Sequence, residues 1–218
     1  MKRYILLVLM LSTIVTFGQH KAFQFGFRGG VNIGWFNTNA EGYSNNGAKI
    51  GGSWGIVADF FLMEGYSFTT GFDVLYLNGS INAPSEMVGL NATLQRDFKT
   101  KYIELPLIFT MKTKNIKEKV RIYGQVGFGL GFLLSAKAND TYYPIDGGDP
   151  INKNENAYDD FRFTRESLIL GVGVEIPIKG STYVRTGLKF DNAFVNVFKD
   201  DTAKARNNFL ELGASVIF

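Results

Sequence analysis

Apolar and polar residues alternate along eight segments of this 218-residue chain, and this alternation limits its fold more than any other feature. A period of two is typical of β-strands with one apolar and one polar face. Each segment reaches the length of about 9–11 residues that a tilted strand needs to cross a membrane, whereas strands of soluble sheets most often have about 5–6 residues. The expected strands are Gln24–Phe36, Gly51–Leu62, Phe68–Asn78, Phe98–Met111, Val120–Leu134, Arg162–Ile178, Thr182–Val195 and Asn208–Phe218.

Long and short connections alternate between these strands. The long ones are Asn37–Ile50, Gly79–Asp97, Ser135–Phe161 and Asn196–Asn207, and the short ones are Met63–Ser67, Lys112–Lys119 and Lys179–Ser181. Outer-membrane barrels place long loops at the extracellular end and short turns at the periplasmic end. We therefore expect an all-β fold, an eight-stranded antiparallel transmembrane β-barrel of the outer membrane, with extracellular long loops and periplasmic short turns. Outer-membrane lipid is then the expected partner of its outer wall.

The two faces of the expected strands differ in composition as well as in polarity. In the fifth strand Val126, Phe128 and Leu130 share one face, and Gly127 and Gly129 share the other. A glycine-rich face suits a crowded interior better than a solvated surface, so we expect the apolar face to point outward to lipid. Outward aromatic residues then fall near both strand ends, as in the aromatic belts of membrane proteins. They are Phe25, Phe60, Phe68, Phe109 and Phe218 near the turns, and Trp35, Trp54, Tyr76, Phe132 and Phe190 near the loops.

Both ends of the chain carry features of an exported barrel. Lys2 and Arg3 precede an apolar run, Tyr4–Phe17, which is followed by the small residue Gly18. This order is typical of a secretory signal peptide, and the run is too short for a membrane anchor. We expect residues 1–19 to be a signal peptide and residues 20–218 to form the barrel domain. The last strand ends in Phe218, which resembles the signal that barrel-insertion machinery recognises, so that machinery is a second expected partner.

Charged residues lie on the face that we expect to point inward. They are Arg28, Asp59, Asp73, Glu104, Arg121, Glu175, Arg185, Lys189, Asp191 and Glu211. The interior of an eight-stranded barrel is just wide enough for side chains to fill, and buried charges must be paired. We expect a structural network of ion pairs that closes the barrel. The alternative is a narrow gated pore or a proton-linked site.

Candidate catalytic and metal-binding groups are scarce. The chain has no cysteine and a single histidine, His20, which precedes the first expected strand. Without a thiolate nucleophile or a histidine base in the barrel, we expect no enzyme activity, no cofactor and no metal. The net charge of +3 comes with scattered basic residues, so nucleic acid is not an expected partner.

The third long connection is rich in acidic and aromatic residues and is a candidate external binding loop. The residues that carry this interpretation are Asp140, Tyr142, Tyr143, Asp146, Asp149 and Tyr158. Their spacing does not match an EF-hand, so a solvated loop without a ligand is the alternative. An unknown extracellular or envelope protein is the partner that such a loop would contact.

Several segments resemble the PorT-like outer-membrane β-barrel family. Tyr102–Leu107 is similar to the Tyr-Leu-Glu-Ile-Pro-Leu segment of that family, and weaker similarities cover Phe72–Tyr76 with Gly79, Gly127–Phe132 and Val184–Leu188. Asp73 and Thr186 depart from the residues that are usual there. The resemblance spans the chain from about Phe23 to Phe218 and implies an eight-stranded barrel.

The sequence therefore predicts a non-enzymatic outer-membrane barrel that acts through its external loops in surface binding, adhesion or envelope integrity. The alternatives are a narrow channel or transporter for small solutes, and a component of a secretion or assembly apparatus.

Overall fold

Nine strands and one short 3-10 helix make up the described part of the fold. The computed structural model describes residues 22–83, 92–116, 120–145, 148–200 and 203–218. The strands are β1 (Phe23–Thr38), β2 (Ser44–Met63), β3 (Tyr66–Ala83), β4 (Ala92–Lys112), β5 (Arg121–Pro144), β6 (Ile151–Asn156), β7 (Thr164–Lys179), β8 (Thr182–Ala193) and β9 (Ala205–Ile217). A single 3-10 turn, η2 (Tyr158–Asp160), follows β6. In the described part of the chain, no helix is long and apolar enough to span a membrane.

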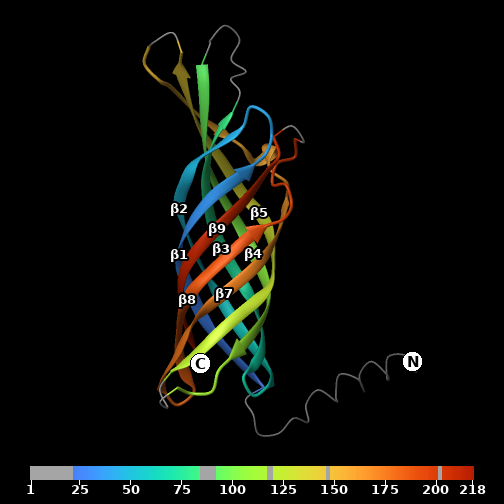
Figure 1. Ribbon diagram of the computed structural model, residues 1–218, viewed down its shortest axis with the longest axis vertical. Helices are drawn as coiled ribbons and strands as arrows, with labels where there is room; N and C mark the ends of the chain where they lie inside the picture. The colour runs from blue at the N-terminus through green and yellow to red at the C-terminus, as the bar shows by residue number, and fades with distance from the viewer. Residues whose placement is uncertain (1–21, 84–91, 117–119, 146–147, 201–202) are drawn as a thin grey trace, which may run out of the picture.

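Eight of the strands close into an antiparallel ring, which confirms the predicted fold class (Figure 1). Neighbours in sequence pair around the ring, and the ring closes where β1 pairs with β9, from Gly26 opposite Ile217 to Thr38 opposite Ala205. Within the described residues the remaining strand, β6, pairs with β5 alone, beyond the last residue pair that joins β5 to β7. The barrel wall thus continues beyond the ring as a small sheet of β2, β3, β4, β5 and β6.

Tight turns lie at one end of the barrel, which also carries the C-terminus and is called the turn end here (Figure 1). The turns between β2 and β3 and between β7 and β8 have two residues each, and they contain Gly65 (φ 79°) and Gly180 (φ 62°). These left-handed backbone angles are strained for residues with a side chain and favourable for glycine. The opposite end is called the loop end.

Most strands extend further at the loop end than the sequence predicted, but β7 begins at Thr164 rather than Arg162 and β8 ends at Ala193 rather than Val195. Most of the expected loop Ser135–Phe161 is strand, because β5 continues to Pro144 and β6 follows it. Likewise β2 begins at Ser44, and β3 ends only at Ala83. The alternation of apolar and polar residues marks the part of a strand that meets lipid. Backbone hydrogen bonds continue a ladder through polar residues as well, so polarity alone placed the strand ends too early.

The apolar face points outward along the ring, as predicted. On β5, Phe128 and Val126 are exposed, whereas Gly127 and Gly129 are buried. On β7, Val172 is 56% exposed although it lies near the middle of a strand, which suits a wall that faces lipid.

Inward glycines make room for large polar side chains. A Cβ atom on Gly173 would lie 2.6 Å from the hydroxyl of Tyr123, and one on Gly129 would lie 2.6 Å from the hydroxyl of Ser167. Both separations are far shorter than van der Waals contact. Glycine on the inner face therefore reflects crowding in a narrow barrel.

Candidate functional site

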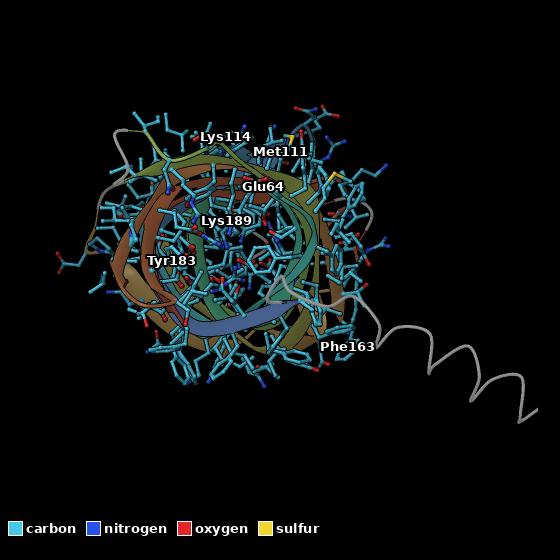
Figure 2. The ribbon with its side chains drawn as sticks, turned by 90° about the horizontal axis from the view of Figure 1, so that it is seen from below. Glu64, Met111, Lys114, Phe163, Tyr183 and Lys189 are labelled. Carbon is cyan, nitrogen blue, oxygen red and sulfur yellow. The ribbon has the colours of Figure 1, made fainter. Side chains whose placement is uncertain are left out.

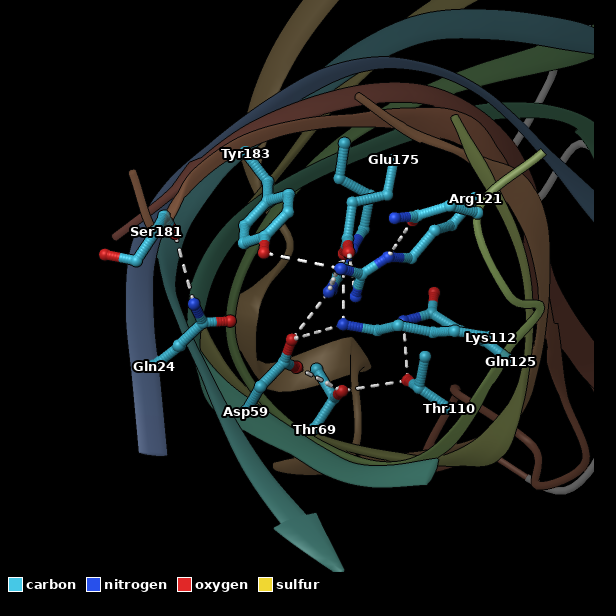
Figure 3. A network of polar contacts seen from close by, with 12 residues as sticks. Gln24, Asp59, Thr69, Thr110, Lys112, Arg121, Gln125, Glu175, Ser181 and Tyr183 are labelled. Atoms are coloured by element: carbon cyan, nitrogen blue, oxygen red, sulfur yellow. Dashed lines mark hydrogen bonds and ion pairs between the residues drawn. The ribbon is translucent and has the colours of Figure 1, made fainter. Parts of the chain in front are cut away.

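Charged side chains fill the turn end of the barrel interior (Figure 3). The guanidinium of Arg185 on β8 bridges two carboxylates, with its Nη2 atom 2.5 Å from Asp59 on β2 and 2.9 Å from Glu175 on β7. The Nζ atom of Lys112 lies 3.0 Å from Glu175 and 3.4 Å from Asp59. These four residues are nearly or fully buried. Four strands are therefore joined across the barrel lumen by one ion cluster.

Neutral polar groups extend this cluster around the wall. The hydroxyl of Thr69 donates to Asp59 at 2.5 Å and lies 2.8 Å from the hydroxyl of Thr110. Gln125 in turn donates to the hydroxyl of Thr110 at 3.0 Å. At the mouth, Arg121 lies 3.6 Å from Glu175 and is about a third exposed. Protein groups therefore supply the hydrogen-bond and ion-pair partners of this cluster, from the opening at the turn end inward.

A second group of charges lies deeper in the barrel. Arg28 on β1 pairs with Asp73 on β3. Lys189 on β8, which points into the ring in Figure 2, lies 3.4 Å from Glu211 and 3.8 Å from Glu104. Arg28 and Lys189 are partly buried, whereas their carboxylate partners are almost completely buried.

The third group lies nearest the loop end and is completely buried. Arg165 on β7 donates to Asp191 at 2.5 Å and to the backbone oxygen of Asn207 at 2.8 Å. Ser167 also donates to Asp191, at 3.0 Å. Glu104, 3.5 Å from Arg165, links this group to Lys189.

The interior charges of the described residues balance. Six cationic side chains face six carboxylates: Arg28, Lys112, Arg121, Arg165, Arg185 and Lys189 with Asp59, Asp73, Glu104, Glu175, Asp191 and Glu211. A balanced, paired set leaves no excess charge to attract a free ion. The structure brings together the ten residues that the sequence placed on the inner face, Arg28, Asp59, Asp73, Glu104, Arg121, Glu175, Arg185, Lys189, Asp191 and Glu211.

Sequence reasoning missed two members of the network, Arg165 and Lys112. In β7 a period of two leads from the inward Glu175 back through Ile169 and Ser167 to Arg165. Lys112 was assigned to a turn, but β4 runs to this residue and Lys112 shares the parity of Glu104 and Thr110. Extending the alternation past the apolar stretch would have found both residues.

A polar cavity of about 60 Å³ lies within the charged part of the barrel. Its lining includes Arg28, Tyr123, Gln125, Arg185 and Glu211. A volume of this size can hold a few water molecules but no larger solute.

Aromatic side chains close the loop end of the interior. Phe36, Phe98, Phe161, Phe198 and Phe209 are buried in one apolar cluster, which we call the aromatic cap. The ring centroids of Phe161 and Phe198 lie 4.8 Å apart, and the centroid of Phe98 lies within 5.4 Å of both. Phe161 and Phe198 come from the segments between strands and join through an isolated β-bridge. The segments that follow β6 and β8 thus fold over the barrel opening.

The cap rests directly on the charge network. The guanidinium of Arg165 lies 5.5 Å from the ring centroid of Phe209, and the ammonium of Lys189 lies 5.1 Å from it. Contacts of this kind are favourable because the ring face carries partial negative charge. The interior therefore consists of ion pairs toward the turn end and packed rings toward the loop end.

The residues of the candidate external loop do not converge on one site. Asp140 lies in β5 and is buried against Arg96 at 2.9 Å. Tyr142 and Tyr143 also belong to β5, Tyr158 packs against the aromatic cap, and Asp149 is exposed. Asp146 lies outside the described residues. Within the described residues, no group of three or more His, Cys, Asp or Glu side chains could hold a metal ion.

The pKa values of two carboxylates beyond the apolar band, Asp140 and Asp97, are shifted in opposite directions. Burial raises the pKa of Asp140, and the neighbouring Arg96 offsets this effect only in part. Burial also opposes ionisation of Asp97, but hydrogen bonds from Ser80, Lys49 and Gln95 outweigh it and lower the pKa of Asp97. Asp97 is therefore held in its charged form by three neighbours on the outer wall.

The structure is similar to those of small outer-membrane proteins. The attachment invasion locus protein Ail of Yersinia pestis, in complex with the heparin analogue sucrose octasulfate, shares 17% identity over 90% of this chain and 99% of Ail, with a TM-score of 0.40. Neisserial surface protein A shares 14% identity over 91% of this chain and 98% of that protein, with a TM-score of 0.48. OprG from Pseudomonas aeruginosa shares 13% identity over 91% of this chain and 97% of OprG, with a TM-score of 0.43.

Sequence comparison identifies the family. No curated protein matches the chain. The family model for the outer membrane protein beta-barrel domain matches residues 17–208, which is most of the chain. The match agrees with the closed antiparallel ring of eight strands and with the outward apolar face. This chain belongs to the outer membrane protein beta-barrel domain family.

Proposed function

We propose that this protein is a closed, non-enzymatic barrel that acts at its loop end in surface binding, adhesion or envelope integrity. The filled interior carries this proposal. Paired charges occupy the turn end, the aromatic cap occupies the loop end, and the cavity between the charges is only about 60 Å³. A solute that crosses the barrel would have to displace both the paired charges and the aromatic cap. The strands that rise beyond the apolar band are then the surface on which a partner can act.

The chemistry of the interior also supports a non-enzymatic role. The acidic side chains that could act as general acids or bases are each paired with a cationic group, as Glu175 is with Arg185 and Lys112. The single histidine, His20, lies outside the described residues. Ion pairing of this kind stabilises one charge state, whereas general acid–base catalysis needs a group that changes its charge readily.

The projecting sheet supports an extracellular protein partner. At its tip Tyr143, Ile145 and Ile151 are all more than 40% exposed. Exposed apolar groups on a rigid support are typical of interaction surfaces. This proposal places the loop end outside the cell and the turn end in the periplasm, the arrangement usual for such barrels.

A role in a secretion or assembly apparatus is the third candidate. Tyr102–Leu107 resembles a segment of the PorT-like family, which is a narrower group than the family identified above. We propose membership of that narrower group on this motif. We also propose that residues 1–19 are a signal peptide and that the strand ending in Phe218 addresses the insertion machinery. Residues 1–19 lie outside the described part of the chain.

Conductance across a planar lipid bilayer tests closure. We expect the refolded full-length protein to show no stable current steps at neutral pH, because both layers of the interior are filled. Stable steps in the wild-type protein would support the second candidate, a narrow channel or transporter for small solutes, and would overturn the closed barrel.

Crosslinking on intact cells tests the site of action. A photoreactive residue at Tyr143 should capture a protein or surface component, whereas the same residue at Phe218, at the turn end, should not capture that component. Capture of a stoichiometric periplasmic partner from Phe218 alone would instead favour the assembly role.

A further inference from the structure

Three lysines with no carboxylate partner among the described residues meet on the outer wall of the barrel. Lys99 and Lys101 lie on β4 and Lys137 lies on β5, and we call them the lysine patch. In the register of β4 and β5, Lys99 stands directly opposite Lys137. Lys99 and Lys101 share the parity of Ile103 and Phe109, the outward residues of β4. Lys137 lies past the register shift between β4 and β5 and pairs with Lys99, so it also lies on the outer face. Lys99 and Lys137 are exposed, and Lys101 is half-buried.

This arrangement needs a physical explanation. Like charges directly opposite each other on neighbouring strands are destabilising. Among the described residues, no carboxylate lies within ion-pair distance of the patch. Asp97, two residues from Lys99 on the same face of β4, already accepts hydrogen bonds from Lys49, Ser80 and Gln95. The positive charge of the patch is therefore not balanced by the described wall.

The patch lies where the apolar band of the wall ends. On β4 the outward residues change from Leu105 and Ile103 to Lys101 and Lys99, and on β5 they change from Phe132 and Leu134 to Lys137. The neighbouring strand supplies Tyr76, opposite Lys101, whose ammonium lies 5.4 Å from the ring centroid. Aromatic and lysine side chains take these positions at the boundary between acyl chains and lipid headgroups.

We propose that the lysine patch binds the phosphate groups of lipid A, the lipid part of lipopolysaccharide. Lysine ammonium groups form charge-assisted hydrogen bonds with phosphate oxygens, and three of them suit a lipid that carries more than one phosphate. The outward apolar residues below the patch, Ile103, Phe132 and Leu134, pack against its acyl chains. The assignment rests on the proposed orientation, in which the loop end faces the outer leaflet.

Lipid binding to the purified full-length barrel in uncharged detergent tests the proposal. Native mass spectrometry would measure affinities for lipid A with two phosphates, the same lipid with one phosphate, the fully dephosphorylated lipid and phosphatidylglycerol. We expect the bisphosphorylated lipid to bind the wild-type protein at least about tenfold more tightly than the dephosphorylated lipid, and we expect the affinity to fall as salt is added.

The double variant Lys99→Gln/Lys137→Gln should lose this preference. The matched control is Lys153→Gln/Lys204→Gln, which makes the same change in net charge at exposed positions outside the patch. We expect the control to bind as the wild-type protein does. Without added lipid, the patch variant should unfold no more easily than the wild type, because the substitution removes repulsion between Lys99 and Lys137. That measurement separates lost binding from lost folding.

Several outcomes would overturn the assignment. Equal affinity of the wild type and the patch variant for the bisphosphorylated lipid would do so, as would an equal loss in the control variant. Equally tight, lysine-dependent binding of phosphatidylglycerol would show a general site for anionic lipids rather than one for lipid A. None of these results depends on whether the barrel conducts, so failure here and failure of the closed-barrel proposal are distinguishable.

Discussion

The guanidinium of Arg165 and the carboxylate of Asp191 lie 2.5 Å apart, and neither side chain has any exposed surface. Arg165 is at the start of β7 and Asp191 is near the end of β8, so the pair ties two neighbouring strands together just below the aromatic cap. Glu104, 3.5 Å from Arg165, extends the contact across the lumen to β4. One arginine therefore holds two carboxylates in a region with no access to solvent.

Replacing Arg165 should weaken the barrel strongly. In Arg165→Met, Asp191 and Glu104 stay buried while losing their closest cation, which typically costs about 3–5 kcal/mol. Equilibrium unfolding in urea with lipid vesicles would measure this loss. Lys49→Gln is the control, since Lys49 and Asp97 are both about a third exposed and such pairs contribute about 0–1 kcal/mol.

A second substitution should separate charge from packing at this position. Arg165→Met/Asp191→Leu removes both charges of the pair, so it should recover much of the stability that Arg165→Met loses. If the double variant is no more stable than the single one, an unpaired buried carboxylate is not the cause of the loss.

An arginine in the middle of the outer wall should be costly. Val172 lies near the midpoint of β7 and is 56% exposed. In a lipid bilayer Val172→Arg should lower the free energy of unfolding by about 2–4 kcal/mol, because the charge meets the hydrocarbon layer. Asn139→Arg, on the outer face of β5 beyond the apolar band, should have little effect. An equal loss in the free energy of unfolding for both substitutions would contradict the assignment of the apolar residues to the lipid-facing side.

The aromatic cap should contribute to stability through packing alone. Phe198 is buried among Phe36, Phe98 and Phe161. Phe198→Ala would leave a cavity there and should cost about 3–5 kcal/mol, as is usual for a buried phenylalanine. Phe194→Ala removes an exposed ring from the same segment and should cost less. A similar cost for both would indicate that the cap is not closely packed.

Acid should loosen the wall around Asp97. Hydrogen bonds lower the pKa of this carboxyl below its ordinary value. Its contribution to stability is therefore fully present above the unfolded pKa of about 4 and is lost as the pH falls through the lower folded value. Amide hydrogen exchange in β3 and β4 beside Ser80 and Asp97 should speed up in that range. Asp97→Asn should abolish the acid-dependent step, and a step that persists in this variant would assign it to another group.

The inward placement of the charges could be predicted from the sequence, but their pairing could not. Strand parity places Asp59, Glu175 and Arg185 on the inner face. Their partners depend on strand register and on how closure brings β2 opposite β7 and β8, which are more than a hundred residues away in sequence. Lys112 was missed because it lies just past the expected strand Phe98–Met111. Arg165 lies within the expected strand Arg162–Ile178, but before the apolar stretch on which the inner face was assigned.

The aromatic cap and the lysine patch are harder to predict from the sequence than the inward charges are. Phe161 and Phe198 lie in segments without a period of two, so nothing local indicates that they meet. Lys99 and Lys137 face each other only because of the register between β4 and β5, which includes a shift between Lys101 and Tyr102.

The sequence alone determined that this protein is an outer-membrane barrel and which face of each strand meets lipid. Alternation and polarity are local properties, and the hydrophobic effect acts on them directly. The tertiary structure decided where the strands end, which charge meets which, and how the loop end is closed. Backbone pairing continues through polar residues, and contacts between distant strands exist only once the ring has closed.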